Sequence, residues 1–135
     1  MNKFMEQAIA IKDDIVEYRR VIHSNPEVGA ELPKTKAYVM DKLREFGYEP
    51  EEICESGIVA TIEGSKPGKT FLLRADMDAL PMAEATDCDF KATNGAMHSC
   101  GHDMHTAMLL GAAKLLRQNQ DEIEGTIKLV FQPDE

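Results

Sequence analysis

Hydrophobic residues near the start of the chain recur at alternating steps of four and three, at Phe4, Ala8, Ile11, Ile15, Tyr18 and Ile22. This spacing puts them on one face and predicts a single amphipathic helix. The helix should end near Ser24, because Pro26 disfavours helical backbone at the residue before it. Pro33 suits the first turn of a second helix, whose apolar positions continue to Phe46 and which Gly47 ends.

Two short β-rich runs follow, at residues 58–62 and 70–74, and the sequence Ser65-Lys66-Pro67-Gly68 between them is a turn signal. Two such runs joined by a turn predict a β-hairpin. The second run leads to Asp76 and Asp78, where the apolar strand ends. Sites in open α/β sheets gather at the carboxyl ends of strands, so these acids could orient metal-bound histidines. An acidic turn with solvated carboxylates fits their spacing equally well.

The rest of the chain contains one more helix and one more strand. Residues 82–96 are polar and loop-like, and a wide apolar face then predicts a helix over about residues 104–119, which Asp103 is placed to cap. Residues 126–131 predict a strand that ends in Gln132-Pro133-Asp134-Glu135. The order helix, helix, strand, strand, helix, strand predicts an α/β layer architecture.

Composition narrows the classes of function. A chain of 135 residues that is 43% hydrophobic and 29% charged suits one globular domain. The net charge of -9, with no basic patch, argues against a nucleic-acid partner. No apolar run approaches the roughly 20 residues that span a membrane. The three cysteines are irregularly spaced and no signal-peptide pattern opens the chain, so we expect a cytoplasmic location.

Residue types that can bind a metal are most concentrated in residues 97–106. This segment contains one cysteine, one acid and three of the four histidines: Cys100, Asp103, His98, His102 and His105. These residue types are the ligands of zinc and similar divalent metals. The segment lacks the four ligands of a structural zinc site, but an incomplete protein shell is what a catalytic metal requires. Clustered histidines with a single core cysteine also occur without any metal, so both interpretations stay open. We interpret the fourth histidine, His23, as a polar helix-end residue favoured by the helix dipole.

Four motifs give the chain a resemblance to the M20 metallopeptidase family, most closely to its amidohydrolase branch. They are Arg20-x-x-His23-x-x-Pro26-Glu27, Leu73-Arg74-Ala75-Asp76-Met77-Asp78-Ala79-Leu80-Pro81, Met97-His98-Ser99-Cys100-Gly101-His102-Asp103-x-His105-Thr106 and Val130-Phe131-Gln132-Pro133-Asp134-Glu135. The branch includes hippurate hydrolases, N-acyl-amino-acid amidohydrolases, indole-acetyl-amino-acid hydrolases and N-acetyl-diaminopimelate deacetylases. The resemblance implies a zinc-peptidase-like α/β catalytic domain, with helices on a mixed sheet, of which residues 1–135 are the N-terminal portion.

The resemblance also implies roles for individual residues. Cys100 and His102 match metal ligands, with the cysteine as a thiolate, and a complete active site holds two divalent metals, which could be zinc, manganese, nickel or cobalt. Asp78 matches the acid that orients the site, and Glu135 matches the general base.

Three further motif residues receive no catalytic assignment. Asp76 stands where many relatives outside this branch have a metal-binding histidine, and we assign it no ligand role. Asp103 and His105 are interpreted as supporting or structural residues.

The implied activity is metal-dependent hydrolysis of the amide bond of small N-acyl-amino acids, which releases a carboxylic acid and a free amino acid. In the family a second glutamate follows the general base, two later histidines complete the ligand set, and an inserted α/β domain often mediates homodimerisation. None of these lies within the 135 residues, so we expect the chain alone to be inactive. The alternative is a non-catalytic fragment without enough ligands to retain metal.

Overall fold

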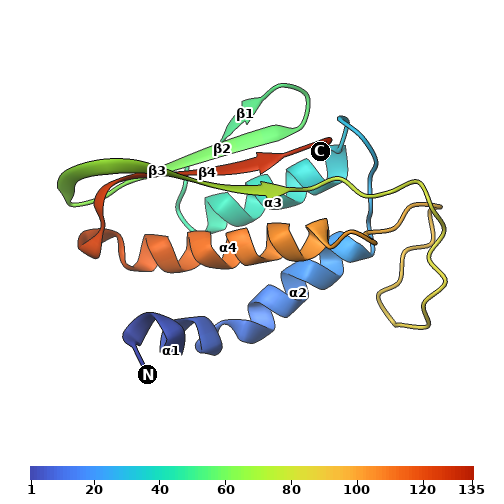
Figure 1. Ribbon diagram of the computed structural model, residues 1–135, viewed down its shortest axis with the longest axis horizontal. Coiled ribbons are helices and arrows are strands. Elements are labelled where there is room, and N and C mark those ends of the chain that lie inside the picture. The colour runs from blue at the N-terminus through green and yellow to red at the C-terminus, as the bar shows by residue number, and fades with distance from the viewer.

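Helices cover one face of a four-stranded sheet (Figure 1). The computed structural model describes residues 1–135. In chain order the elements are α1 (Lys3–Ala10), α2 (Lys12–His23), α3 (Pro33–Glu45), β1 (Glu51–Ile53), β2 (Gly57–Glu63), β3 (Lys66–Asp76), α4 (His102–Gln118), a 3₁₀ turn (Gln120–Glu122) and β4 (Glu124–Gln132). Helices α3 and α4 lie beneath the sheet, and α2 contacts α4 on the side away from it. The predicted α/β architecture with a mixed sheet is confirmed.

The last strand of the chain lies in the middle of the sheet. The strand order is β1-β2-β4-β3, with β4 antiparallel to β2 and parallel to β3. Leu129 therefore lies opposite Ala60 on one side and Leu73 on the other. The predicted hairpin between residues 58–62 and 70–74 is wrong, because both strands form but β4 separates them.

Close backbone contacts explain why the turn after β2 does not close a hairpin. The chain crosses the start of β4, where Gly64 N donates to Gly125 O at 2.8 Å and Ser65 N donates to Ile123 O at 3.0 Å. A Cβ on Gly64 would lie 2.0 Å from Ile123 O, and a Cβ on Gly125 (φ +88°) would lie 2.0 Å from Lys69 O. Only glycine lets these backbones approach so closely. The chain does turn at this sequence, but it crosses the start of β4 and continues as β3 along the other edge of that strand.

The first predicted helix is interrupted. At Ile11 the backbone leaves helical geometry (φ −101°, ψ 12°), and α1 and α2 meet there at an angle (Figure 1). The prediction of one continuous helix is therefore wrong, although its apolar stripe is used on both sides of the break. The bend keeps that stripe against α4, where Phe4 lines an apolar cavity with Leu73 and Leu116.

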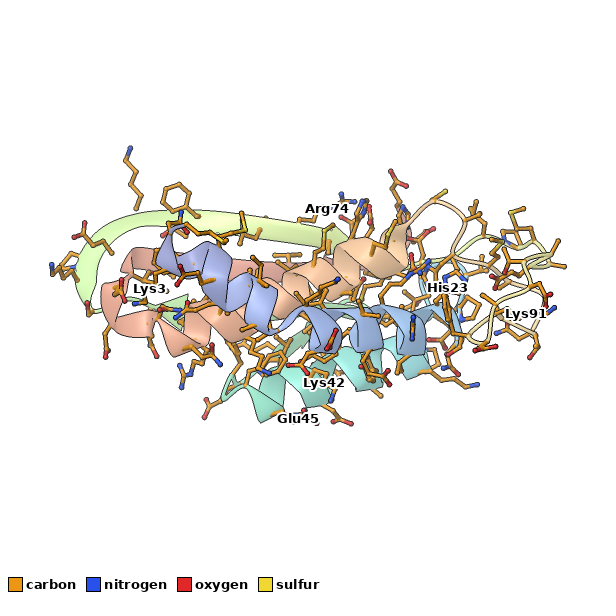
Figure 2. All side chains as sticks on the ribbon, turned by 90° about the horizontal axis from the view of Figure 1, so that it is seen from below. Lys3, His23, Lys42, Glu45, Arg74 and Lys91 are labelled. Atoms are coloured by element: carbon orange, nitrogen blue, oxygen red, sulfur yellow. The ribbon has the colours of Figure 1, made fainter.

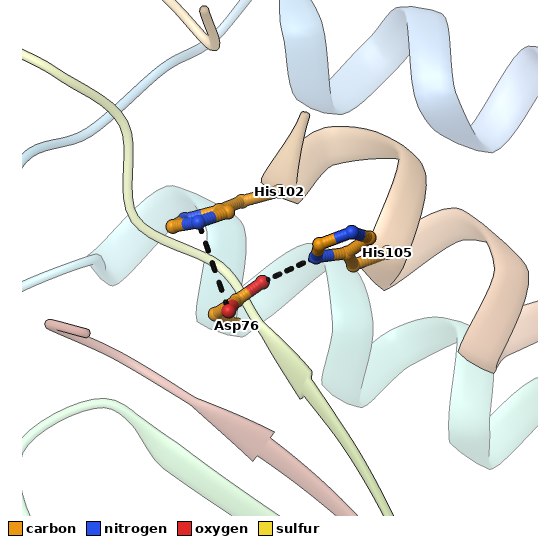
Figure 3. A group of neighbouring side chains, drawn as sticks. All are labelled: Asp76, His102 and His105. Atoms are coloured by element: carbon orange, nitrogen blue, oxygen red, sulfur yellow. Dashed lines mark hydrogen bonds and ion pairs between the residues drawn. The ribbon is translucent and has the colours of Figure 1, made fainter. Parts of the chain in front are cut away.

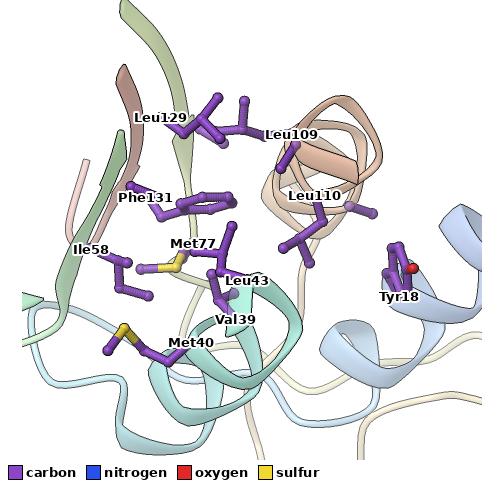
Figure 4. Packing of buried hydrophobic residues seen from close by; sticks show 14 of the residues in the cluster. Tyr18, Val39, Met40, Leu43, Ile58, Met77, Leu109, Leu110, Leu129 and Phe131 are labelled. Carbon is purple, nitrogen blue, oxygen red and sulfur yellow. The ribbon is translucent and has the colours of Figure 1, made fainter. Parts of the chain in front are cut away.

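The core lies between the sheet and the helices α3 and α4 (Figure 4). Leu129 and Phe131 from β4 and Leu110 from α4 are all 0% exposed. Fully burying a side chain of this kind contributes roughly 1.5–3 kcal/mol. This packing fixes α4 with its first turn at the carboxyl ends of β3 and β4. None of the helices has the length and apolar character needed to cross a membrane.

Candidate metal centre

Three segments converge at one edge of the sheet. Asp76 is the last residue of β3, His102 is the first residue of α4, and Glu135 follows the end of β4 by three residues. Because β3 and β4 are parallel, their carboxyl ends meet at the same edge. The side chains that the sequence singled out at these strand ends therefore lie beside the first turn of α4.

His102 is held in one orientation by Asp78. Its Nδ1 lies 2.9 Å from the Asp78 carbonyl oxygen and 3.2 Å from Asp78 Oδ1, and both oxygens can only accept a hydrogen bond. The Nδ1–H therefore donates to Asp78, and Nε2 keeps its lone pair when the ring is neutral. Nε2 faces Glu135 Oε2 at 3.2 Å and Asp76 Oδ2 at 3.6 Å.

Asp76 makes a second carboxylate–histidine contact, with His105. Its Oδ1 lies 2.7 Å from His105 Nδ1, while Arg74 Nη1 lies 3.4 Å from Oδ2. Burial alone would raise the pKa of Asp76, but the hydrogen bond from His105 and the nearby His102 outweigh it and lower that pKa. Asp76 is 4% exposed and Asp78 is 9% exposed, so the interpretation as a turn with solvated carboxylates is wrong.

Asp76, His102 and His105 form a donor cluster that fits a metal ion (Figure 3). One potential ligand atom from each lies within 4.8 Å of those of the other two. Two imidazoles and a carboxylate suit zinc and the neighbouring divalent transition metals. Asp76 and His105 were assigned no ligand role from the sequence. The spacing of His105, one helical turn after His102, was the signal that could have joined them.

Cys100 lies outside this cluster. Its side chain is exposed and lines a cavity of about 460 Å³ together with Phe90 and Met104. The loop-to-helix junction turns between Cys100 and His102, at Gly101, whose φ is +95°. The geometry thus brings together Asp76, His102 and His105 at the edge of the sheet, while the sulfur of Cys100 lies beyond the turn, in the cavity that the loop before α4 lines.

Helix α4 begins differently from the prediction. Its N-cap is Gly101, without a side-chain cap, and Asp103 lies inside the first turn. The predicted capping role of Asp103 is wrong, because its carboxylate bonds to Arg19 and His23 of α2. His23 is at the end of α2 as predicted, but it is 3% exposed and contacts two carboxylates.

Comparison with known proteins identifies the family. The family described as Peptidase family M20/M25/M40 matches residues 72–135. Thermostable carboxypeptidase 2 from Saccharolobus solfataricus is 48% identical over 138 aligned residues, which cover 100% of this chain and 35% of that protein. The chain belongs to the M20 peptidase family. An N-acyl-L-amino acid amidohydrolase from Geobacillus stearothermophilus is 42% identical over 124 residues, 90% of this chain and 34% of that protein.

A solved structure agrees with this M20 membership. The crystal structure of the YXEP protein of Bacillus subtilis, described as a dinuclear metal binding peptidase from the M20 family, superimposes with a TM-score of 0.88 at 36% identity. The match covers 92% of this chain and 35% of that one. The chain therefore has the fold of part of an M20 catalytic domain and spans about 35% of the length of these relatives.

Proposed function

We propose that residues 1–135 form the N-terminal portion of the catalytic domain of a metal-dependent hydrolase that cleaves the amide bond of N-acyl-amino acids. One observation carries the proposal: Glu135 Oε2 lies 3.2 Å from His102 Nε2. The expected general base is thereby next to the nitrogen of an expected metal ligand, although the two residues come from different elements.

The chain's own residues would divide the chemistry between them. The Glu135 side chain is 61% exposed, so a water molecule and a substrate can reach it. It would accept a proton from that water and deliver it to the leaving amine. Asp78 turns the Nε2 of His102 toward Glu135 by accepting the Nδ1–H, and its Oδ1 also accepts the backbone N–H of Glu135 at 3.3 Å. Asp78 therefore orients both partners.

A divalent metal would polarise the amide carbonyl and lower the pKa of a water molecule when bound here. We propose Cys100, as a thiolate, and His102 as residues that hold it, with zinc, manganese, nickel or cobalt as the candidates. Asp76 and His105 are a second donor pair around the same histidine. A complete active site would hold two ions, which agrees with the description of the Bacillus subtilis relative as dinuclear.

The substrate class follows from what the relatives' names share. A carboxypeptidase and an N-acyl-amino-acid amidohydrolase both cleave an amide whose nitrogen belongs to an amino acid with a free carboxylate. We propose this shared chemistry, a small N-acyl-amino acid or short peptide, as the substrate class. Since the chain covers about 35% of those relatives, we assign turnover to a polypeptide of their length that contains residues 1–135.

Metal binding and hydrolysis test the proposal separately. Zinc titration of the chain against a chromogenic chelator should show binding that His102→Ala removes. Hippurate and N-acetyl-amino acids should be hydrolysed by the longer polypeptide and not by the 135-residue chain. Absence of zinc binding by the chain would favour the alternative of a non-catalytic fragment. A fully metallated longer polypeptide that leaves both substrates intact would contradict the substrate class.

A further inference from the structure

A second cluster of histidine and carboxylates lies on the other side of the first turn of α4. We call it the His23 cluster, and its members are Arg19, His23, Glu84 and Asp103. His23 Nδ1 lies 2.7 Å from Asp103 Oδ2, and His23 Nε2 lies 2.9 Å from Glu84 Oε1. Arg19 Nε donates to the same Asp103 oxygen at 2.8 Å. The side chains of His23, Glu84 and Asp103 are 4%, 1% and 1% exposed.

These contacts determine where the protons are. Asp103 faces a guanidinium, which is always charged, so its carboxylate is ionised. Burial alone would raise the pKa of Glu84, but hydrogen bonds from His23, Thr86 and Ala92 lower it to about 2, so Glu84 is ionised as well. An ionised carboxylate only accepts hydrogen bonds, so each ring nitrogen of His23 must donate. Each ring nitrogen of His23 is thus placed to donate to a carboxylate, and Arg19 supplies a second donor to Asp103.

The cluster joins three segments that are distant in the sequence. His23 is the last residue of α2, Asp103 is the second residue of α4, and Glu84 lies in the loop that connects β3 to α4. Glu84 also accepts the backbone N–H of Ala92 at 2.6 Å, so it closes residues 84–92 into a loop. Figure 2 shows His23 at the end of the molecule where this loop, marked by Lys91, extends.

We propose that His23 is a positioning residue: its two N–H groups hold the first turn of α4 and the 84–92 loop together, and so place His102 and Cys100. Asp103 directly follows His102, so the start of α4 is fixed from both sides, by His23 through Asp103 and by Asp78 through His102. Cys100 lines the same cavity as His23, Glu84 and Asp103. This role rests on the proposed function only in that His102 and Cys100 are taken as the site that is positioned.

Nitrogen-15 NMR of the histidine rings in the native chain tests the proton count without any activity assay. We expect both ring nitrogens of His23 to carry a proton near neutral pH. A ring with one protonated nitrogen would overturn the proposal. The conservative variant Glu84→Gln gives a matched spectrum, because its amide can donate to Nε2. In that variant His23 should be neutral, with its single proton on Nδ1.

Hydrogen exchange tests the positioning. His23→Gln cannot donate to both carboxylates, so the amides of Met104 and His105 should exchange about 10- to 100-fold faster, as loss of charged hydrogen bonds predicts. Glu84→Gln keeps both bonds and should stay within about threefold of the native chain. Asp14→Asn is the matched control, since it breaks the pair between Asp14 and Lys114, another link from α2 to α4. The proposal is overturned if the Met104 amide exchanges equally fast in His23→Gln and Asp14→Asn. It is also overturned if Glu84→Gln raises the exchange rate as much as His23→Gln does.

Discussion

His102 and Asp103 are neighbours in the chain, yet their side chains enter two clusters of opposite character. On the Asp103 side both nitrogens of His23 have a carboxylate, and the carboxylates are 1% exposed. On the His102 side Glu135 is 61% exposed, and Nε2 has only the longer contacts of 3.2 and 3.6 Å. The same residue types thus build one closed cluster and one open cluster. What prepares the second for chemistry is its exposure, because a water molecule or a metal ion can reach the groups around Nε2.

The largest expected effect is on the open side. Glu135→Gln, in the longer polypeptide, should lower the hydrolysis rate by about 10²- to 10⁴-fold, because a general base contributes on that order. Zinc content measured after dialysis should stay unchanged, since the amide still fits the same space. A near-normal rate in this variant would remove Glu135 from the chemistry.

A substitution in the His23 cluster should lower the free energy of unfolding. Asp103→Ala leaves the ring of His23 and the guanidinium of Arg19 without their shared carboxylate, so we expect a loss of about 3 kcal/mol in the free energy of unfolding. Asp14→Asn, which breaks a partly exposed pair with Lys114, should cost less than about 1 kcal/mol. Urea unfolding measures both losses. Equal losses would mean that breaking the buried His23 cluster destabilises the fold no more than breaking an exposed ion pair.

Metal affinity separates the two donor sets. Cys100→Ala should weaken zinc binding by at least about 100-fold if the thiolate is a ligand, because loss of a residue that only supports a ligand already costs about 10- to 100-fold, and activity should fall with it. His105→Ala should have a smaller effect, because its Nδ1 is already bonded to Asp76 and its side chain is 49% exposed. Full zinc occupancy and a normal rate in Cys100→Ala would refute the thiolate assignment. The cluster of Asp76, His102 and His105 would then be the remaining candidate.

Glu84 should also give the stability a pH dependence in acid. Its pKa is about 2 in the folded chain against 4.5 for the free side chain, so folding holds the ionised form. The stabilisation is complete above about pH 4.5 and is lost as the pH falls toward about 2. Urea midpoints measured across this window should fall less steeply for Glu84→Gln than for the native chain. Parallel curves would show that Glu84 does not contribute.

The sequence predicted elements more reliably than their partners. Periodicity is local, so the helix expected over about residues 104–119 forms at residues 102–118, and the strand expected at 58–62 forms at 57–63. Which strand pairs with which depends on contacts that no local pattern records. The insertion of β4 between β2 and β3 is such a case, since the crossing that permits it depends on the close approach of Gly64 and Gly125 to neighbouring backbone.

The candidate site divides in the same way. Asp78, His102 and Glu135 were named from motifs, and they lie together at the edge of the sheet. Glu84 was not named, because an acid in a polar loop has the same sequence signature as its solvated neighbours Asp87 and Asp89. Only the tertiary contact with His23, 61 residues earlier, distinguishes it.

The place of β4 also determines when the sheet can exist during synthesis. Residues 124–132 are made after β1, β2 and β3, yet β2 and β3 are joined in the sheet only through them. Until residues 124–132 leave the ribosome, β1 can pair with β2, but β3 has no strand to pair with. Because β4 pairs with β2 on one side and with β3 on the other, the four-stranded sheet can close only after these nine residues have been made.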